Sequence, residues 1–401
     1  MIGAVLVGLT VAASAQEWPQ WRGPNRDATV VGFTPPAAWP EKLTSKWSVD
    51  VGLGYATPLV VGNRIFVFSR QDESEVMSAL EADSGKVVWR TAYPVSFEMA
   101  KAAAPHGKGP KSTPAFAGGK LYSIGMTGIV TAFDAASGKQ LWQKTAPGVM
   151  TTWTSHSFSP LVDRGNVIFH VGGNDKGALT AFDATSGEVK WSWAGDGPGY
   201  GSPIIAELGG VRQIVTMTQK RVIGVDAATG ALLWERPYTT GYDQNAVTPI
   251  VYGQLLIISG YQNPVVALSI KRAGEAWTAE PAWENAGVSL YMSDAVVIGD
   301  TLFGFSQRNS GQFFALDPRS GKTLWTGEPR QATNAAIVKA GDLWFALKDD
   351  GELIVAKRNP SAFEVLRRYA VATSATWAQP VVSDRGILIK DTSTLALWTF
   401  K

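Results

Sequence analysis

Residues 132–142 read Ala-Phe-Asp-Ala-Ala-Ser-Gly-Lys-Gln-Leu-Trp, and their acid, glycine and tryptophan recur along the chain at fixed spacing. In this copy Gly138 follows Asp134 by four positions, and Trp142 follows Gly138 by four. The other copies are Asp183, Gly187, Trp191; Asp226, Gly230, Trp234; Asp317, Gly321, Trp325; and a weaker one at Glu81, Gly85, Trp89. A phrase repeated at such a period indicates one supersecondary unit copied several times.

A second phrase, Ser or Thr followed by Pro, opens most of the units. It precedes an apolar strand, a Gly-containing turn and another apolar strand. The openings are Thr57-Pro58, Thr113-Pro114, Ser159-Pro160, Ser202-Pro203, Thr248-Pro249 and Gln379-Pro380, with Asp294-Ala295 and Ala335-Ala336 lacking the proline. Each unit therefore holds four short strands rich in β-branched and aromatic residues, which is the pattern of a β-propeller blade.

The last strands of the units give the blade number. Five of them end at Trp89, Trp142, Trp191, Trp234 and Trp325, one at Trp283 after a degenerate turn, and one at 366–369 without Trp. The C-terminal unit has only three strands, and its fourth is available at 45–49, marked by Trp47. We predict an all-β, eight-bladed propeller of four-stranded antiparallel blades, closed by an N-terminal strand that completes the last blade and leaves no free edge.

The repeated residues have structural explanations. A carboxylate at the start of a hairpin turn accepts backbone N–H groups, and Gly supplies the positive φ that the turn requires. A tryptophan on the last strand can fill the wedge between neighbouring blades. The acid–Gly–Trp phrase is therefore predicted to specify turns and packing, and the functional residues are expected outside it.

Composition excludes several classes of protein. The 401 residues are 17% charged with a formal net charge of +2, so there is no basic field for binding nucleic acid. The chain has no Cys and hence no disulfides. Its three histidines, His106, His156 and His170, have no metal-ligand spacing, and we expect no metal site.

The N-terminus predicts export. Residues 2–13 are almost wholly apolar and lead into Ala13-Ser14-Ala15, and the run is too short to span a membrane. We expect a signal peptide at 1–15, an extended segment at 16–44 and a single propeller domain at 45–401, with a buried N-terminal helix as the alternative. The protein would be periplasmic or secreted, monomeric, not membrane-spanning and without a lipid-bearing cysteine. The segment with Trp18 and Trp21 would dock on the outer wall of the propeller, or be a mobile tail for a partner.

The phrases at 132–142 and 181–187 resemble the repeat of PQQ-like (quinoprotein-type) propellers. That family includes quinoprotein alcohol dehydrogenases and the propeller component of the bacterial outer-membrane β-barrel assembly machinery. Residues 17–27 are similar to the opening of many secreted bacterial propellers of this type. The resemblance covers roughly residues 45–401 and implies the propeller fold.

For the enzymes, the resemblance implies calcium held by acids and amides, an Asp base, and a quinone stacked on a Trp beside an adjacent-cysteine disulfide. The absence of Cys removes that disulfide. Nothing in the spacing of Asp243, Asp294 and Trp377 requires such roles. We therefore expect neither PQQ nor calcium as a cofactor, and no catalytic residue is assigned.

The loops that lead into the innermost strands are predicted to form the mouth of the central channel. The candidate ligand- or partner-binding residues there are Tyr55, Lys111, His156, Tyr200, Asn245, Tyr291, Asp294, Asn334, Trp377 and Gln379. Aromatic and amide side chains on a ring of loops suit a peptide, a sugar or a small polar ligand. The alternative is that they only plug the channel. A long loop from Pro94 to Lys111 should form a flap on one face.

We expect a non-catalytic scaffold that binds a protein or peptide partner in the cell envelope. Two alternatives stay open: a PQQ- and calcium-dependent dehydrogenase of alcohols or sugars, and a carbohydrate-binding propeller. Whether the protein is an enzyme is not decided by the sequence.

Overall fold

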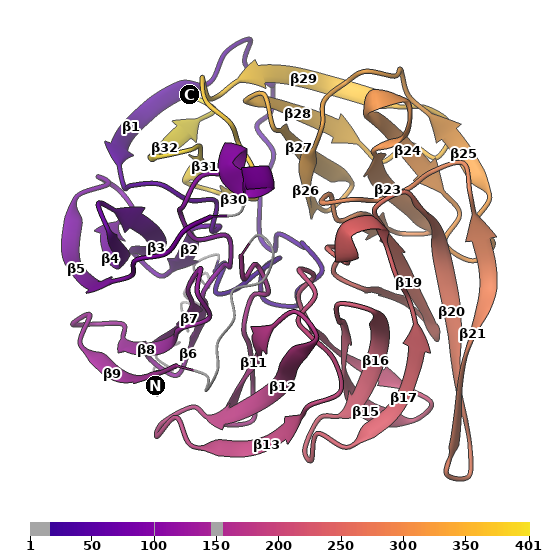
Figure 1. The fold of residues 1–401 in the computed structure, drawn as a ribbon. Coiled ribbons are helices and arrows are strands. Elements are labelled where there is room, and N and C mark those ends of the chain that lie inside the picture. Colours follow the sequence, from indigo (N-terminus) through magenta and orange to yellow (C-terminus); the bar gives the residue numbers. More distant parts are fainter. Residues whose placement is uncertain (1–16, 100, 146–154) are drawn as a thin grey trace, which may run out of the picture.

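The chain forms a closed ring of eight four-stranded antiparallel sheets in the computed structural model, which describes residues 17–99, 101–145 and 155–401 (Figure 1). The predicted eight-bladed propeller is confirmed. The expected signal peptide at 1–15 lies outside the described residues. We number the blades along the chain, from blade 1 (β2–β5) to blade 8 (β30–β32 with β1).

Each blade has the four strands that the repeat predicts. Blades 1 to 4 comprise β2 (Leu59–Val61), β3 (Arg64–Gln71), β4 (Ser74–Glu81), β5 (Val87–Pro94); β6 (Ala115–Ala117), β7 (Lys120–Ile124), β8 (Val130–Asp134), β9 (Gln140–Lys144); β10 (Leu161–Asp163), β11 (Asn166–Gly173), β12 (Lys176–Asp183), β13 (Val189–Trp193); and β14 (Ile204–Leu208), β15 (Val211–Met217), β16 (Arg221–Asp226), β17 (Leu232–Pro237). Blades 5 to 8 comprise β18 (Ile250–Tyr252), β19 (Leu255–Gly260), β20 (Asn263–Ala273), β21 (Ala276–Asn285); β22 (Val296–Ile298), β23 (Thr301–Ser306), β24 (Gln312–Leu316), β25 (Thr323–Thr326); β26 (Ala335–Ala340), β27 (Leu343–Lys348), β28 (Glu352–Lys357), β29 (Glu364–Ala370); and β30 (Val381–Ser383), β31 (Gly386–Lys390), β32 (Thr394–Thr399), β1 (Thr44–Asp50).

The ring closes through the N-terminal strand, as the strand count predicts. β1 pairs antiparallel with β32, and Trp47 lies opposite Leu397. The indole Nε1 of Trp47 donates to the carbonyl of Ala82 in blade 1, at 3.2 Å. One strand thus completes blade 8 and also contacts the first blade of the ring (Figure 1).

Where the acid–Gly–Trp phrase is present, it joins one blade to its neighbour. Asp134 Oδ1 accepts the N–H of Ser137 at 2.8 Å, and Gly138 follows in the left-handed region at φ +74°. The indole of Trp89, from the preceding blade, covers this turn and donates to the carbonyl of Ala135 at 3.2 Å. A Cβ on Gly138 would lie 2.5 Å from that indole. Gly is therefore required for conformation and for contact between blades.

The core lies between adjacent blades. Met77 and Ala79 of β4 pack with Leu121 and Phe133 of blade 2, and all four are buried. The wedges between the other blades are filled in the same way, because alternate residues of each middle strand face the neighbouring sheets.

Blade 5 departs from the pattern. Its two outer strands, β20 and β21, run longer than their counterparts and project from the rim as a hairpin (Figure 1). Trp283 on β21 still donates to the carbonyl of Pro318 in blade 6, at 3.1 Å. The blade contact therefore persists although the acid–Gly turn is replaced.

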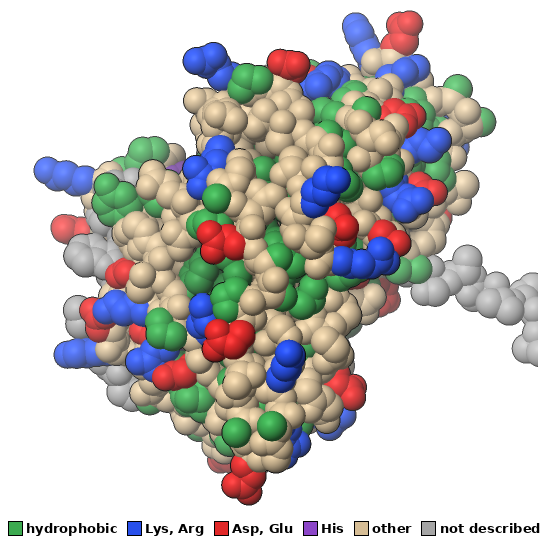
Figure 2. Space-filling model, turned by 90° about the vertical axis from the view of Figure 1, so that its right-hand side faces the viewer, with side chains coloured by type: hydrophobic (Ala, Val, Ile, Leu, Met, Phe, Trp, Pro, Cys, Tyr) green, Lys and Arg blue, Asp and Glu red, His purple; other side chains and the backbone are tan. Residues whose placement is uncertain are grey.

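Helices are few. The structure has three 3-10 helices, η1 (Lys101–His106), η2 (Gly241–Asp243) and η3 (Arg308–Ser310), over the residues that it describes. In that part of the chain, no helix has the length and apolar character needed to cross a bilayer. Figure 2 shows basic and acidic side chains interspersed on one side of the molecule, without a field of a single sign.

Candidate functional site

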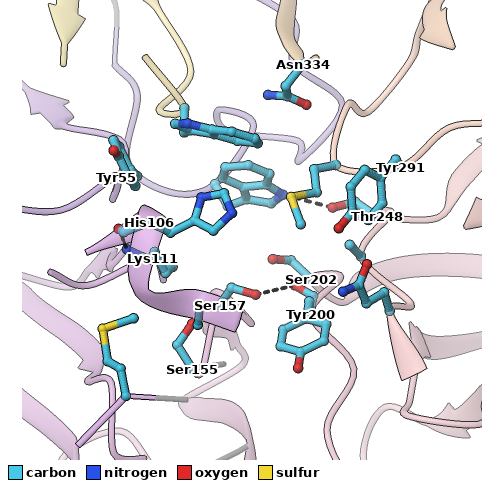
Figure 3. Close-up of a pocket in the computed structure, with 17 residues that line it drawn as sticks. Tyr55, His106, Lys111, Ser155, Ser157, Tyr200, Ser202, Thr248, Tyr291 and Asn334 are labelled. Atoms are coloured by element: carbon cyan, nitrogen blue, oxygen red, sulfur yellow. Dashed lines mark hydrogen bonds between the residues drawn. The ribbon is translucent and has the colours of Figure 1, made fainter. Parts of the chain in front are cut away.

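A cavity of about 260 Å³ opens at the mouth of the central channel (Figure 3). Its walls come from the loops that precede the innermost strands of the blades, together with the flap between blades 1 and 2. The lining residues are Trp21, Tyr55, Met99, Ala103, His106, Lys111, Ser155, Ser157, Tyr200, Ser202, Gln244, Ala246, Thr248, Tyr291, Met292, Asn334 and Trp377.

A girdle of hydrogen bonds holds these loops in register. It is built from the Ser/Thr-Pro position, where the residue before proline is restricted to extended backbone. The backbone N–H of this residue donates to the side-chain oxygen of its counterpart in the next blade, at 2.8–3.1 Å. The pairs are Thr57 with Thr113, Thr113 with Ser159, Ser159 with Ser202, Thr248 with Asp294, and Gln379 with Thr57. The second repeated phrase therefore fixes the position of these loops relative to one another at the channel mouth.

The flap forms one side of the cavity. Met99, Ala103 and His106 line it from the flap, where η1 lies. The ring of His106 meets Trp377 of blade 8 edge-on, with 4.9 Å between ring centroids. The flap thus reaches across blade 1 to the loop of blade 8.

Lys111 at the base of the flap sets the charge of the site. Its Nζ donates to the backbone carbonyls of His106 and Gly107 and lies 4.8 Å from the ring centroid of Tyr55. Burial, reinforced by the nearby cation of Lys390, lowers the pKa of Lys111 to about 7. No Asp or Glu is present among the described residues that line the cavity.

Two basic neighbours of Lys111 are also perturbed. Lys390 is buried and donates to four backbone carbonyls, including those of Gly52 and Gly54, at 3.1 and 3.0 Å. Burial lowers the pKa of Lys390 to about 8. Burial and the adjacent Lys111 also hold the pKa of His106 below its usual range, so this imidazole is neutral at pH 7.

The floor of the cavity comes from the N-terminal segment. The Nε1 of Trp21 donates to Thr248 Oγ1 at 2.9 Å, which places this indole at the innermost strand of blade 5. The next residue, Arg22, is buried and donates to the carbonyl of Ala295 in blade 6 at 2.8 Å. Arg26 donates to the carbonyl of Ser159 in blade 3 at 3.0 Å. The segment therefore crosses the channel and does not lie on the outer wall.

Six of the predicted binding residues line the cavity. They are Tyr55, Lys111, Tyr200, Tyr291, Asn334 and Trp377. Figure 3 shows Lys111 and Tyr291 on opposite sides of the cavity. Asn334 Oδ1 accepts Ser293 Oγ at 2.6 Å, which orients its amide. Their role in binding stays a prediction.

The other four predicted residues are buried behind the cavity wall. Asn245 donates to the carbonyls of Thr218 and Tyr238, each at 2.9 Å, and so holds its own loop. His156 is 2% exposed, and neither ring nitrogen has a hydrogen-bond partner within the described part of the chain. Burial lowers its pKa to about 4.

Asp294 and Gln379 bind the N-terminal segment. Asp294 lies 3.4 Å from the Arg22 guanidinium, and Gln379 Oε1 accepts the backbone N–H of Arg22 at 3.2 Å. Burial raises the pKa of Asp294, and the positive charge of Arg22 opposes that rise. Both residues stand where five other blades have Ser or Thr. These two departures from the repeat occur where the N-terminal segment covers the loops.

A row of tyrosines runs outward from the cavity. Tyr291 lines the wall, Tyr261 follows at 4.9 Å between ring centroids, and Tyr242 follows Tyr261 at 6.2 Å. Tyr242 is 81% exposed and has φ of 62°, which is uncommon for a bulky residue. The cavity thus continues as an aromatic strip on the surface.

The described residues that line the mouth include no carboxylate. Carboxylates are among the oxygen ligands that calcium takes in proteins. The carboxylate of Asp294 lies behind the wall and is paired with Arg22. Across the described ranges, no cluster of His, Asp or Glu could hold a metal ion.

Several lining residues were not predicted. Trp21, Ser155, Ser202, Gln244 and Thr248 reach the cavity through the N-terminal segment, the loops or the girdle itself. For Ser202 and Thr248 the signal was present, because both belong to the repeated Ser/Thr-Pro phrase. For Trp21 the sequence gives no indication of its path.

The fold and the site define a β-propeller of the PQQ-like type with a cavity at one end of its channel. A family model described as outer membrane protein assembly factor BamB matches residues 72–327, and the chain belongs to this family. The resemblance found in the repeat is therefore confirmed.

Similar proteins agree with this assignment. The outer membrane protein assembly factors BamB of Yersinia pestis and Shewanella oneidensis are each 24% identical to the chain, over 86% of this chain and 86% of the relative. The structure of BamB from Moraxella catarrhalis matches with a TM-score of 0.62 and 17% identity, covering 89% of this chain and 99% of that one. The quinohemoprotein alcohol dehydrogenase of Comamonas testosteroni matches with a TM-score of 0.68 and 16% identity, covering 98% and 81%. At these identities the structural matches show the fold alone.

Proposed function

We propose that this protein is a non-catalytic propeller scaffold of the cell envelope that binds an extended peptide segment of a partner protein at the channel mouth. The observation that carries the proposal is the aromatic strip from Tyr291 through Tyr261 to Tyr242, which joins the cavity to the open surface. A small ligand would fill the cavity alone, whereas an extended chain would use both the cavity and the strip. Tyr and Met are enriched at protein interfaces, and Met292 lies beside Tyr291.

Other observations support the same reading. The relatives carry the name of an outer membrane protein assembly factor, which supports an envelope location and a protein partner. The described lining residues include no carboxylate to serve as a base or a calcium ligand. We therefore propose a periplasmic or secreted monomer that works without PQQ or calcium.

The test is selection of peptides from a random displayed library. The bait proteins are the wild type, a cavity-filled Ala246→Trp variant, and a Val189→Trp control on the exposed outer strand β13. We expect peptides that bind the wild type and the control but not the filled variant, provided that all three proteins have similar Tm values. Recovery of no binding peptide from the wild type would contradict the proposal.

The enzyme alternative has its own measurement. A ligand that binds only the native state raises Tm by mass action. We expect no shift with saturating PQQ and Ca²⁺. A clear shift, together with oxidation of an alcohol or sugar, would overturn the scaffold proposal.

A further inference from the structure

We propose that the cavity captures the C-terminal residue of a polypeptide, with the terminal carboxylate beside Lys111 and an apolar or aromatic side chain in the cavity. This inference rests on the proposed function and specifies which part of a partner chain occupies the site.

The charge of the cavity is the first argument. Lys111 is the one lysine or arginine among the described lining residues, and none of those residues is an Asp or Glu that could balance it. Its ammonium donates to two backbone carbonyls, those of His106 and Gly107, which leaves one of its three donors for a ligand. A buried cation without a counter-ion is costly, and an anionic ligand would remove that cost.

Lys390 adds to this preference for an anion. It is buried, its positive charge helps to lower the pKa of Lys111, and its hydrogen-bond partners are neutral backbone carbonyls. The carboxylates of Asp391 and Asp50 offset only part of the effect of burial on Lys390, whose pKa stays lowered to about 8. An uncharged sugar would leave Lys111 without a counter-ion. A peptide carboxylate would balance its charge with one charge-assisted hydrogen bond.

The size of the cavity is the second argument. An apolar cavity of about 150 Å³ holds a benzene-sized ligand. The present cavity, at about 260 Å³, therefore accommodates one large side chain together with a carboxylate. Trp21, Trp377 and Met99 supply apolar surface for such a side chain.

The path of the chain is the third argument. A peptide that follows the tyrosine strip enters beside Tyr291 and crosses the cavity toward Lys111 (Figure 3). On the Lys111 side it meets the flap, where Met99, Ala103 and His106 form the wall. A chain that ends there fits this geometry better than one that must pass through.

The test compares two pools of acetylated hexapeptides, randomised at five positions and ending in Phe. One pool carries a free carboxylate and the other a C-terminal amide. We expect the free-acid pool to bind the wild type at least about tenfold more tightly in fluorescence anisotropy, because a charge-assisted bond contributes about 1.5–3 kcal/mol.

Variants locate the effect. Lys111→Met should abolish the preference for the free acid, and Lys111→Arg should keep it. Lys108→Met is the matched control, because Lys108 is a flap lysine that lies over the Phe97 ring and does not line the cavity. The acid–amide comparison on the wild type needs no variant and stands even if Lys111→Met fails to fold.

The outcomes separate this inference from the proposed function. Equal binding of the acid and amide pools would overturn the inference and leave a peptide-binding site. Binding of selected internal segments, with neither Phe-ending pool bound, would do the same. If no peptide of any kind binds, the proposed function fails as well.

Discussion

Gly187 and Trp142 form the contact between neighbouring blades that recurs with the repeated phrase. The glycine has φ +70°, and a Cβ on it would lie 2.7 Å from the indole of Trp142 in the preceding blade. The same indole donates to the carbonyl of Ala184 at 3.4 Å. Turn conformation and blade packing thus depend on the same residue.

A matched pair of glycine substitutions separates these two roles. Gly253 also has a positive φ, at +60°, but a Cβ there would meet no atom within 4 Å. Gly253→Ala should cost about 1–2 kcal/mol for its backbone conformation. Gly187→Ala should cost about 1–3 kcal/mol more because it crowds Trp142. Urea unfolding of both variants measures the difference, and equal losses would show that the indole contact is unimportant.

The pKa of Lys111 should make peptide binding depend on pH. Its pKa is about 7 in the free protein, so roughly nine-tenths of the ammonium is protonated at pH 6 and roughly one-tenth at pH 8. A carboxylate ligand binds the protonated form and raises this pKa in the complex. Affinity for a free-acid peptide should therefore fall roughly tenfold from pH 6 to pH 8.

The titratable groups near Lys111 do not reverse this expected fall in affinity with rising pH. Burial and the neighbouring Lys111 lower the pKa of His106. Lys390, with a pKa of about 8 and with Asp391 and Asp50 nearby, loses positive charge as the pH approaches 8, which weakens anion binding in the same direction. Titration calorimetry at pH 6, 7 and 8 checks the trend. The amide peptide is the control, and a free-acid affinity that rises with pH would contradict the role of Lys111.

At the scale of elements, the N-terminal segment acts as the floor of the channel. It pairs with blade 1 through Trp18 and Val60, and with blade 7 through Thr29 and Lys339. Between these points Arg22 crosses the channel and pairs with Asp294 at 3.4 Å. The segment thus ties together blades that the repeat alone does not join.

A double-mutant cycle tests this tie. Arg22→Ala leaves the Asp294 carboxylate buried without its partner and should cost about 3–5 kcal/mol. Asp294→Ser restores the Ser or Thr that five other blades use in the girdle. The double variant should therefore lose much less stability than the sum of the single losses, as measured by urea unfolding. Additive losses would show that the two residues act independently.

Local spacing explains which elements the sequence could predict. The blade strands, and the loops with Tyr55, Lys111 and Trp377, follow from a period that is visible within each unit. The course of residues 17–30 does not, because Arg22 binds Asp294 and Ala295 far along the chain, and no periodicity links them. Asp294 and Gln379 do carry a signal, since each replaces the Ser or Thr of its unit. When the path of the N-terminal segment is not known, these two replacements are interpreted as part of a ligand site.

At the scale of the whole molecule, stability depends on closing the ring between β1 and β32. Ser48 lies directly opposite Ala396 in this pairing, and the chain contains no natural cysteine. A Ser48→Cys, Ala396→Cys variant should form a single disulfide that locks the ring and adds about 2–4 kcal/mol. Thermal unfolding of the oxidised and reduced forms checks this, and failure to form the bond under oxidising conditions would contradict the closure.

The central claim is that function lies in the cavity at the channel mouth and outside the repeated residues. A crystal structure of the protein with an acetylated, Phe-ending free-acid peptide tests it most directly. We expect the terminal side chain in the cavity, its carboxylate beside Lys111, and the preceding residues along Tyr291 and Tyr261. A peptide bound on the outer strands or on the β20–β21 hairpin, with the cavity empty, would contradict the claim.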